Sequence, residues 1–404
     1  MAAGVNRRRR DRPAWGLGFV LGSLLGAGVT VIARRAERAA RRGLVDWPKA
    51  EAIAIARLCR AAGTLTPQEL ADSEAEYQAA MARIVPRLVE VLGSELPGVV
   101  DRAGVADRAT WVRANATTFA SLIGRLEADL LDQVMPRGGG LGRATMALTN
   151  RFMTTRQIAW MLAFMGQRVL GQYDLALLSA EQTPGRLLFV EENIRQAAAM
   201  LDLPLQPFRT WIALHETTHA FEFEAHPWLR PYLAERLERQ LAAFSRDSAS
   251  LGRDGLKRLG EALRREPDGT HWMERLMGEE QLRSFRETQA VMSLLEGFSD
   301  YIMDEVGRDL VPDVARISAR FHQRREHRSQ LERAILRLSG IDLKMEQYRR
   351  GERFVAAIAS AGGKTAIARL WEGPESLPSE IELADPGRWL ARVLGASPVE
   401  GLPQ

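Results

Sequence analysis

The sequence contains a single cysteine, Cys59, among its 404 residues. It follows a mostly apolar run at positions 53–58, and this setting predicts a small buried hydrophobic side chain rather than a nucleophile. A lone thiol excludes three features at once: an intramolecular disulfide framework, a zinc site built from cysteines and a dithiol redox centre.

The chain also lacks a strong excess of charge of either sign. Its 55 Lys and Arg residues against 51 Asp and Glu residues give a net charge of +4. Two arginine-rich runs, at positions 7–12 and 34–42, contribute +8, so the rest of the chain carries −4. A nucleic-acid-binding protein spreads its basic charge over a folded surface, so no nucleic-acid partner is expected. The hydrophobic fraction of 46% is that of an ordinary globular chain, with a length sufficient for two or three domains.

Long uncharged runs are rare, and one lies between the two arginine-rich runs. Positions 14–33 hold twenty residues without a charge, which as a helix span about 30 Å, the thickness of a bilayer core. The segment predicts a single-pass membrane helix, and Gly18, Gly22 and Gly26 give it a smooth face through which the chain could form a homo-oligomer. Its orientation stays open because both flanks are basic. The alternative is a glycine-rich hairpin or a buried helix in a soluble, cytoplasmic protein.

The remaining sequence has the periodicity of amphipathic helices. In residues 68–96, apolar side chains recur three and four positions apart and mark a face directed at the core: Tyr77, Met81, Ile84, Leu88 and Val91. Pro86 falls inside this pattern and predicts a kink or a split. The same periodicity continues from Trp111 to Leu131, and the glycine-rich stretch 136–142 is the strongest break between two parts of the chain.

Two further segments differ from this pattern. Residues 152–178 are apolar but interrupted by charged and amide side chains, which favours a helix buried in the core over a second membrane helix. Leu187–Val190 is a short apolar run with a β-branched end, and it is the strand that the sequence predicts most clearly. The expected fold class is therefore mainly α with a small β-sheet or an edge strand.

The motif that decides the functional interpretation is His215-Glu216-Thr217-Thr218-His219. Residues four apart lie on one face of a helix, so the two imidazoles can bind one metal ion. Glu216 would lie beside the open side of the ion and act as the general base that takes a proton from water. Zinc is the metal expected, because a catalytic zinc site uses three protein ligands plus water. The alternative is a metal-free cluster on a partly exposed helix, and the apolar residues around the motif argue against it.

A third ligand is expected from Glu296, in a helical stretch at positions 291–304. Asp300 lies one turn further on the same face, where it can accept a hydrogen bond from the second ring nitrogen of a ligand histidine. The alternative is an acidic pair on an exposed helix face, but apolar residues flank the pair. The sequence thus predicts a zinc site of His215, His219 and Glu296, supported by Asp300.

HETTH followed by EGFSD resembles the gluzincin pattern, in which HExxH on one helix precedes ExxxD on a later one. In that pattern the Glu is the third zinc ligand and the Asp supports the first histidine, which would be His215. The separation of 77 residues between His219 and Glu296 is longer than in the best-known gluzincins. Six further segments are similar to a zincin-like hydrolase family: VDWPKA (45–50), WVRAN (111–115), RVLGQYD (168–174), HPWLRPYL (226–233), GIDLKMEQYRRGERFV (340–355) and ADPGRWLARV (384–393).

The resemblance covers about residues 44–393 and implies a mostly helical zincin. Members of the family are described as zinc-dependent metalloproteases or as associated with deazaflavin-coenzyme biosynthesis. The implied function is a zinc-dependent hydrolase, expected to be a metallopeptidase that cleaves a peptide or amide bond of an unspecified peptide or protein substrate. In zincins an extended peptide pairs with an edge strand, and the strand at 187–190 is the candidate. The expected regions are a basic N-terminus (1–13), the membrane helix (14–33), an N-terminal helical region (34–142), a catalytic core (143–345) and a C-terminal helical region (346–404).

Two other functions stay open. One is a catalytically silent zincin in which the metal only holds helices together, although the intact Glu216 argues against it because a structural site needs no base. The other is a membrane-anchored binding protein that assembles through the glycine face. A cofactor-dependent dehydrogenase is not expected. Residues 361–365 resemble the end of a phosphate loop but lack its opening glycine and its preceding strand, and they predict a helix C-cap.

Overall fold

The computed structural model describes residues 43–134, 141–173, 185–250, 277–326 and 344–395. The predicted membrane segment at 14–33 and both arginine-rich runs lie outside these ranges. Within the ranges, none of the helices has the length and hydropathy of a membrane span. The membrane helix and its glycine face therefore stay a prediction.

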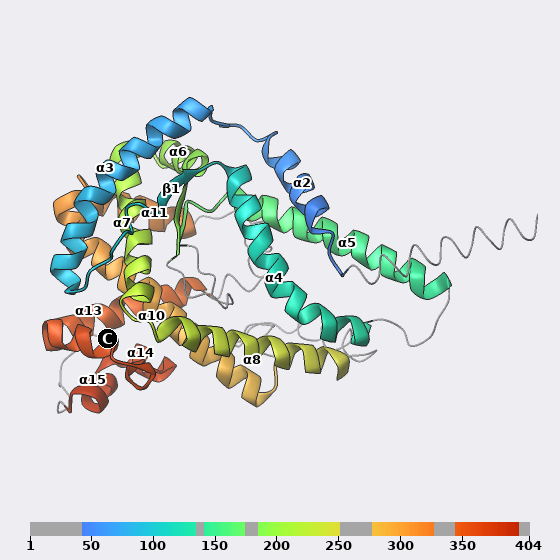
Figure 1. The fold of residues 1–404 in the computed structure, drawn as a ribbon. Helices are drawn as coiled ribbons and strands as arrows, with labels where there is room; N and C mark the ends of the chain where they lie inside the picture. The colour runs from blue at the N-terminus through green and yellow to red at the C-terminus, as the bar shows by residue number, and fades with distance from the viewer. Residues whose placement is uncertain (1–42, 135–140, 174–184, 251–276, 327–343, 396–404) are drawn as a thin grey trace, which may run out of the picture.

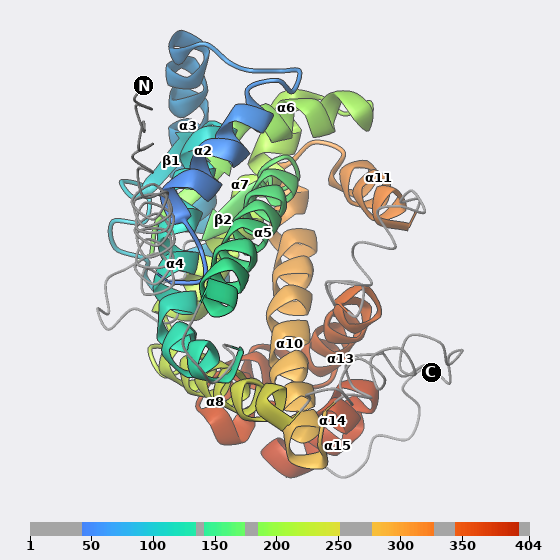
Figure 2. The same ribbon diagram turned by 90° about the vertical axis from the view of Figure 1, so that its right-hand side faces the viewer.

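The described residues fold mainly into α-helices with a small sheet, as the sequence predicts (Figures 1 and 2). The main hydrophobic core joins α3, α7, α10, α13 and the sheet. Among the described residues the helices are α2 (Trp47–Leu58), α3 (Pro67–Leu92), α4 (Arg108–Val134), α5 (Leu141–Gly166), α6 (Glu191–Met200), α7 (Leu205–Glu224), α8 (Leu229–Ser250), α10 (Glu279–Leu310), α11 (Val314–Glu326), α13 (Lys344–Leu370), α14 (Glu380–Ala384) and α15 (Pro386–Leu394), with a 3-10 turn at Pro374–Ser376.

The sheet corrects one expectation about peptide binding. Its strands β1 (Ala103–Ala106), β2 (Gly171–Tyr173) and β3 (Leu187–Val190) lie in the order β1-β3-β2, with β3 parallel to β1 and antiparallel to β2. The predicted strand at 187–190 is confirmed, but its predicted place at the edge is wrong, because β3 is the middle strand and is buried throughout. A strand paired on both sides has no free backbone groups for an added peptide. The edge strand that packs against α7 is β2.

Helix α3 shows how local sequence and core packing agree. Thr66 and Glu69 form a capping box at its N-terminus, and Pro67 occupies the first helical position. The predicted apolar stripe is confirmed, with Val91 partly buried and the four other residues fully buried. The helix continues through Pro86 without splitting. This stripe packs on α7, the helix that carries the HETTH motif.

Helix α5 differs from its prediction. It ends at Gly166, so residues 152–178 do not form one buried helix. One face packs on α2 and α4, whereas the other exposes large apolar side chains: Met146, Leu148, Phe152, Met153 and Trp160. Cys59, just after α2, is also exposed rather than buried as predicted. Apolar content is visible in a sequence, but the face that a neighbouring element covers is set by tertiary packing.

Strand pairing and helix packing connect the regions that the sequence predicts. Strand β1 belongs to the region 34–142, and it pairs with β3 of the region 143–345. Helix α10 of the second region packs extensively on α13, which continues into the region 346–404. The boundaries themselves stay a prediction.

Two glycines allow α10 and α13 to cross in close contact. A Cβ added to Gly351 of α13 would overlap the carbonyl oxygen of Ser293, and one added to Gly297 would overlap the backbone of Gly351. Ser293 and Gly297 lie on the same part of α10 as Glu296, the predicted third ligand. This crossing therefore fixes the backbone from which that carboxylate projects.

Replacing Gly351 with alanine is expected to destabilise the protein by about 2–3 kcal/mol, because the added methyl group meets backbone that cannot move without disturbing the core. Gly124→Ala is the matched control, since Gly124 also lies within a helix and a Cβ there meets no atom within 4 Å. The control should be neutral or stabilising by up to about 1 kcal/mol. Urea unfolding measures both variants, and equal free energies of unfolding would contradict the close crossing.

Candidate metal centre

The HETTH motif lies in the second half of α7, which follows Pro204 and ends at Glu224. The helix is buried on nearly all sides, so its polar groups lose their hydration and need partners within the protein or from an ion. His215 and His219 are one turn apart, with ring centroids separated by 4.6 Å and Nε2 atoms by 3.2 Å. Both rings therefore direct the same nitrogen toward one point.

Glu296 reaches this point from α10. Its Oε2 atom lies 4.0 Å from Nε2 of His215. The donor atoms of His215, His219 and Glu296 all lie within 4.8 Å of one another. The packing of α7 against α10 thus brings together the three side chains that the sequence predicts as ligands.

The donor set suits zinc in both chemistry and spacing. Imidazole nitrogen and carboxylate oxygen are ordinary zinc ligands, and three of them leave one position open. Two nitrogens that each lie about 2.0–2.1 Å from a tetrahedral ion are separated by about 3.3 Å, close to the 3.2 Å between the Nε2 atoms here. The Glu296 oxygen lies 4.0 Å from Nε2 of His215, on a side chain that is one-fifth exposed.

Glu216 lies beside these donors, and the sheet holds its carboxylate. The backbone N–H of Tyr173 in β2 donates a hydrogen bond to Oε2 of Glu216 at 3.1 Å. A Cβ at Gly171 would lie 2.5 Å from Cγ of Glu216, so the glycine makes room for this side chain. Burial raises the pKa of Glu216 to about 7, with the Glu296 carboxylate acting in the same direction and His219 against it. A carboxyl group with this pKa can take up and return a proton near neutral pH.

The second ring nitrogen of His219 is held by two residues that sequence analysis did not single out. Its Nδ1 lies 2.8 Å from Oε2 of Glu222 and 3.2 Å from Oγ of Ser299. Glu222 is fully buried, and with its carboxylate as acceptor the Nδ1–H tautomer is favoured, which leaves the Nε2 lone pair for a metal. A signal was present in the sequence, because Glu222 follows His219, and Ser299 follows Glu296, by three positions on a helix.

The charges of the cluster favour a cation. Burial opposes protonation of His219, but the carboxylates of Glu222, Glu296 and Glu216 outweigh it and raise the pKa of the ring to about 10. A metal ion needs the Nε2 lone pair, so its uptake would release a proton from the cluster. Three carboxylates and two imidazoles in a partly buried site suit a divalent ion.

The role predicted for Asp300 stays a prediction. Asp300 is partly buried on α10, one turn after Glu296. At His215, the Nδ1 atom contacts the sulfur of Met303 at 3.1 Å. A carboxylate contact to Nδ1 at hydrogen-bond distance is seen at the second histidine of the motif, between His219 and Glu222.

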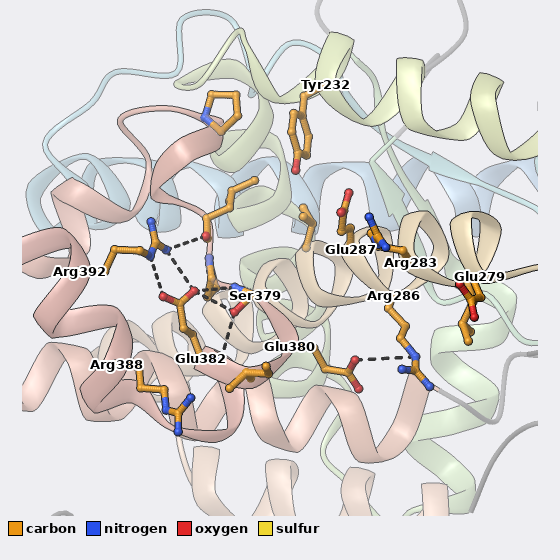
Figure 3. Close-up of a pocket in the computed structure, with 16 residues that line it drawn as sticks. Tyr232, Glu279, Arg283, Arg286, Glu287, Ser379, Glu380, Glu382, Arg388 and Arg392 are labelled. Atoms are coloured by element: carbon orange, nitrogen blue, oxygen red, sulfur yellow. Dashed lines mark hydrogen bonds and ion pairs between the residues drawn. The ribbon is translucent and has the colours of Figure 1, made fainter.

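A separate pocket of about 850 Å³ lies between α8, the first half of α10 and the C-terminal helices (Figure 3). Glu380 and Arg286 face each other across it at 4.0 Å, and Arg392 pairs with Glu382 at 2.6 Å. The described residues that line it do not include the three donors. The pocket is therefore distinct from the metal centre.

Comparison with known proteins identifies the family. The model of the zincin-like metallopeptidase family matches residues 45–390. The chain belongs to this family. It is also similar to a crystal structure from Chloroflexus aurantiacus, described as a putative hydrolase with a novel fold, at 34% identity and a TM-score of 0.65 over 87% of this chain and 100% of that one. A search of curated proteins gave no match.

Replacing Glu222 with glutamine should weaken zinc binding by this zincin by about 10-fold, because the ring of His219 loses the anionic acceptor that fixes its tautomer. Competition with a zinc-sensitive dye measures the change in Kd. Glu224→Gln is the matched control, because Glu224 lies on the same helix but pairs with Arg102 at 2.6 Å instead of a ligand. Equal zinc affinities for the two variants would contradict the positioning role of Glu222.

Proposed function

We propose that this zincin is a zinc-dependent metallopeptidase, with His215, His219 and Glu296 as zinc ligands and Glu216 as the general base. The observation that carries the proposal is the convergence of three donor atoms within 4.8 Å beside a buried carboxylate. Membership of the zincin-like metallopeptidase family supports zinc-dependent hydrolysis as the class of reaction.

Each residue has its own role in the proposed reaction. The chemistry that zinc supplies in such a site is activation of water and polarisation of a carbonyl oxygen. Glu216 takes the proton from the attacking water and returns it to the leaving nitrogen, for which its pKa of about 7 is suited. The backbone N–H of Tyr173 keeps the carboxylate in place during both transfers. Glu222 keeps the ring of His219 turned toward the ligand position.

The main alternative is a zinc site that serves only to hold helices together. Structural zinc sites usually close all four positions with protein ligands, whereas the metal-binding cluster among the described residues has three members. The buried carboxylate of Glu216, with its raised pKa, lies next to the cluster and also favours a catalytic role. A structural zinc site does not require a general base. Both features support the enzyme over the scaffold.

The test of the proposal is to incubate the zinc-loaded protein with a digested proteome and to identify new peptide termini by mass spectrometry. Termini that disappear on chelation and return with added zinc are the expected result. A parallel incubation with simple N-acyl amines, which contain an amide but no peptide bond, separates the two substrate classes. Hydrolysis of these amides without any peptide cleavage would overturn the assignment as a peptidase.

A further inference from the structure

Helix α5 lies on the outside of the molecule, at the right in Figure 1 and toward the viewer in Figure 2. Most of its exposed large apolar side chains form a stripe on one side of the helix. Phe152, Met153 and Trp160 are 51%, 50% and 40% exposed. With Met146 they fall within an arc of about 120° on the helix. The stripe continues into Phe164, whose ring stacks on Trp160 with 5.2 Å between centroids. Large apolar side chains exposed on one side of a helix mark an interaction site more often than scattered exposed residues do.

The charged side chains of α5 are all basic. The helix contains three arginines and neither aspartate nor glutamate. Lys49 and Arg156 lie over the ring of Phe152, at 5.9 and 5.5 Å from its centroid. Arg168, just after the helix, lies 3.7 Å from the centroid of the Phe164 ring. Aromatic and apolar side chains interleaved with Lys and Arg are typical of helices that lie in the interface of an anionic membrane.

The first described residues of the chain, at positions 43–46, are hydrogen-bonded to α5. Nη1 of Arg151 donates a hydrogen bond to the carbonyl oxygen of Gly43 at 2.9 Å, and the backbone N–H of Asp46 donates to Oγ1 of Thr155 at 2.9 Å. Gly43 is ten residues after Ala33, the last residue of the predicted membrane segment. Ten residues span at most about 36 Å, so α5 lies within reach of any bilayer that this segment enters.

We propose that the stripe of α5 rests on an anionic lipid surface, with Phe152, Met153 and Trp160 inserted below the headgroups and the basic side chains at the phosphates. The lipid surface fits better than a protein partner because the stripe combines apolar exposure, basic charge and a short link to a predicted membrane helix. Only four residues separate the end of α5 from β2, the strand that holds Glu216. Docking of α5 would therefore orient the metal centre relative to the membrane.

The experiment places a fluorescent label at chosen positions of the full-length chain, after Cys59→Ser has removed the native thiol. Met153→Cys puts the label on the stripe, and Met200→Cys is the matched control, since Met200 of α6 is a methionine of similar exposure at 57%. Each labelled protein is reconstituted into vesicles of phosphatidylcholine and phosphatidylserine that carry a spin-labelled lipid quencher. A second set of vesicles contains phosphatidylcholine without phosphatidylserine.

Quenching at position 153 is expected to exceed that at position 200 by at least about threefold, and the ratio should fall when phosphatidylserine is left out. Equal quenching at the two positions would overturn the proposal. Energy transfer between labels at position 153 on separate copies, without lipid quenching, would also overturn it by assigning the stripe to a contact between copies. A ratio that does not depend on phosphatidylserine would overturn the role given to the basic side chains.

Discussion

The variant Glu216→Gln is expected to lose peptide hydrolysis by about 10²–10⁴-fold in kcat, because the general base is gone. The protein should keep its zinc, since the three donor side chains are unchanged. Initial rates on a cleaved peptide, together with the metal content of the same sample, measure both quantities. The combination of lost turnover and retained metal separates a catalytic centre from a purely structural one.

The structure gives a physical reason why this variant should fold normally. Burial raises the pKa of Glu216 because the site disfavours a charged carboxylate, and a neutral amide of the same shape avoids that penalty. The amide oxygen can still accept the hydrogen bond from the backbone N–H of Tyr173. The melting temperature should therefore equal or exceed that of the parent protein. Glu280→Gln, at an exposed position of α10, is the control that should leave kcat unchanged, and a Glu216→Gln protein with full activity would contradict the role of Glu216.

The ligand residues could be predicted because each of them is recognisable from the residues close to it in the sequence. His215 and His219 share a helix face by spacing alone, and the apolar residues around them indicate that the helix is buried. Glu296 was found in the same way, from a helical stretch in which few acids interrupt an apolar pattern. The contact between α7 and α10 could not be derived from the sequence of either helix. It depends on the close crossing of α10 with α13 and on the packing of α10 against α7.

The residues that hold the ligands and the general base in place were harder to predict, because their contacts depend on how the helices and the sheet pack. Nδ1 of His219 lies at hydrogen-bonding distance from Glu222, whose side chain is fully buried, and Ser299 adds a contact from α10. Spacing places Glu222 near His219 but does not show that water is excluded there. The backbone N–H that holds Glu216 belongs to a strand of only three residues, too short for a recognisable alternation of polar and apolar side chains.

The position of β3 illustrates the limit of strand prediction. The run Leu187–Val190 was recognisable as a strand, but its neighbour β1 has the sequence Ala-Gly-Val-Ala, with a single β-branched residue. Nothing in that sequence indicates a parallel partner more than eighty residues away in the chain. Without that partner β3 would be an edge strand, and with it β3 is the centre of the sheet.

The metal content of the purified protein shows whether imidazoles from α7 and a carboxylate from α10 bind one zinc ion, as we propose. His219→Ala and Glu296→Ala remove one ligand each. His226→Ala and Glu305→Ala are the controls, because they remove a histidine and a helix α10 glutamate outside the donor set. We expect close to one zinc per chain in the parent protein and both controls, and less than about a tenth of that in both ligand variants. Zinc that persists at the parental level in either ligand variant would contradict the proposal.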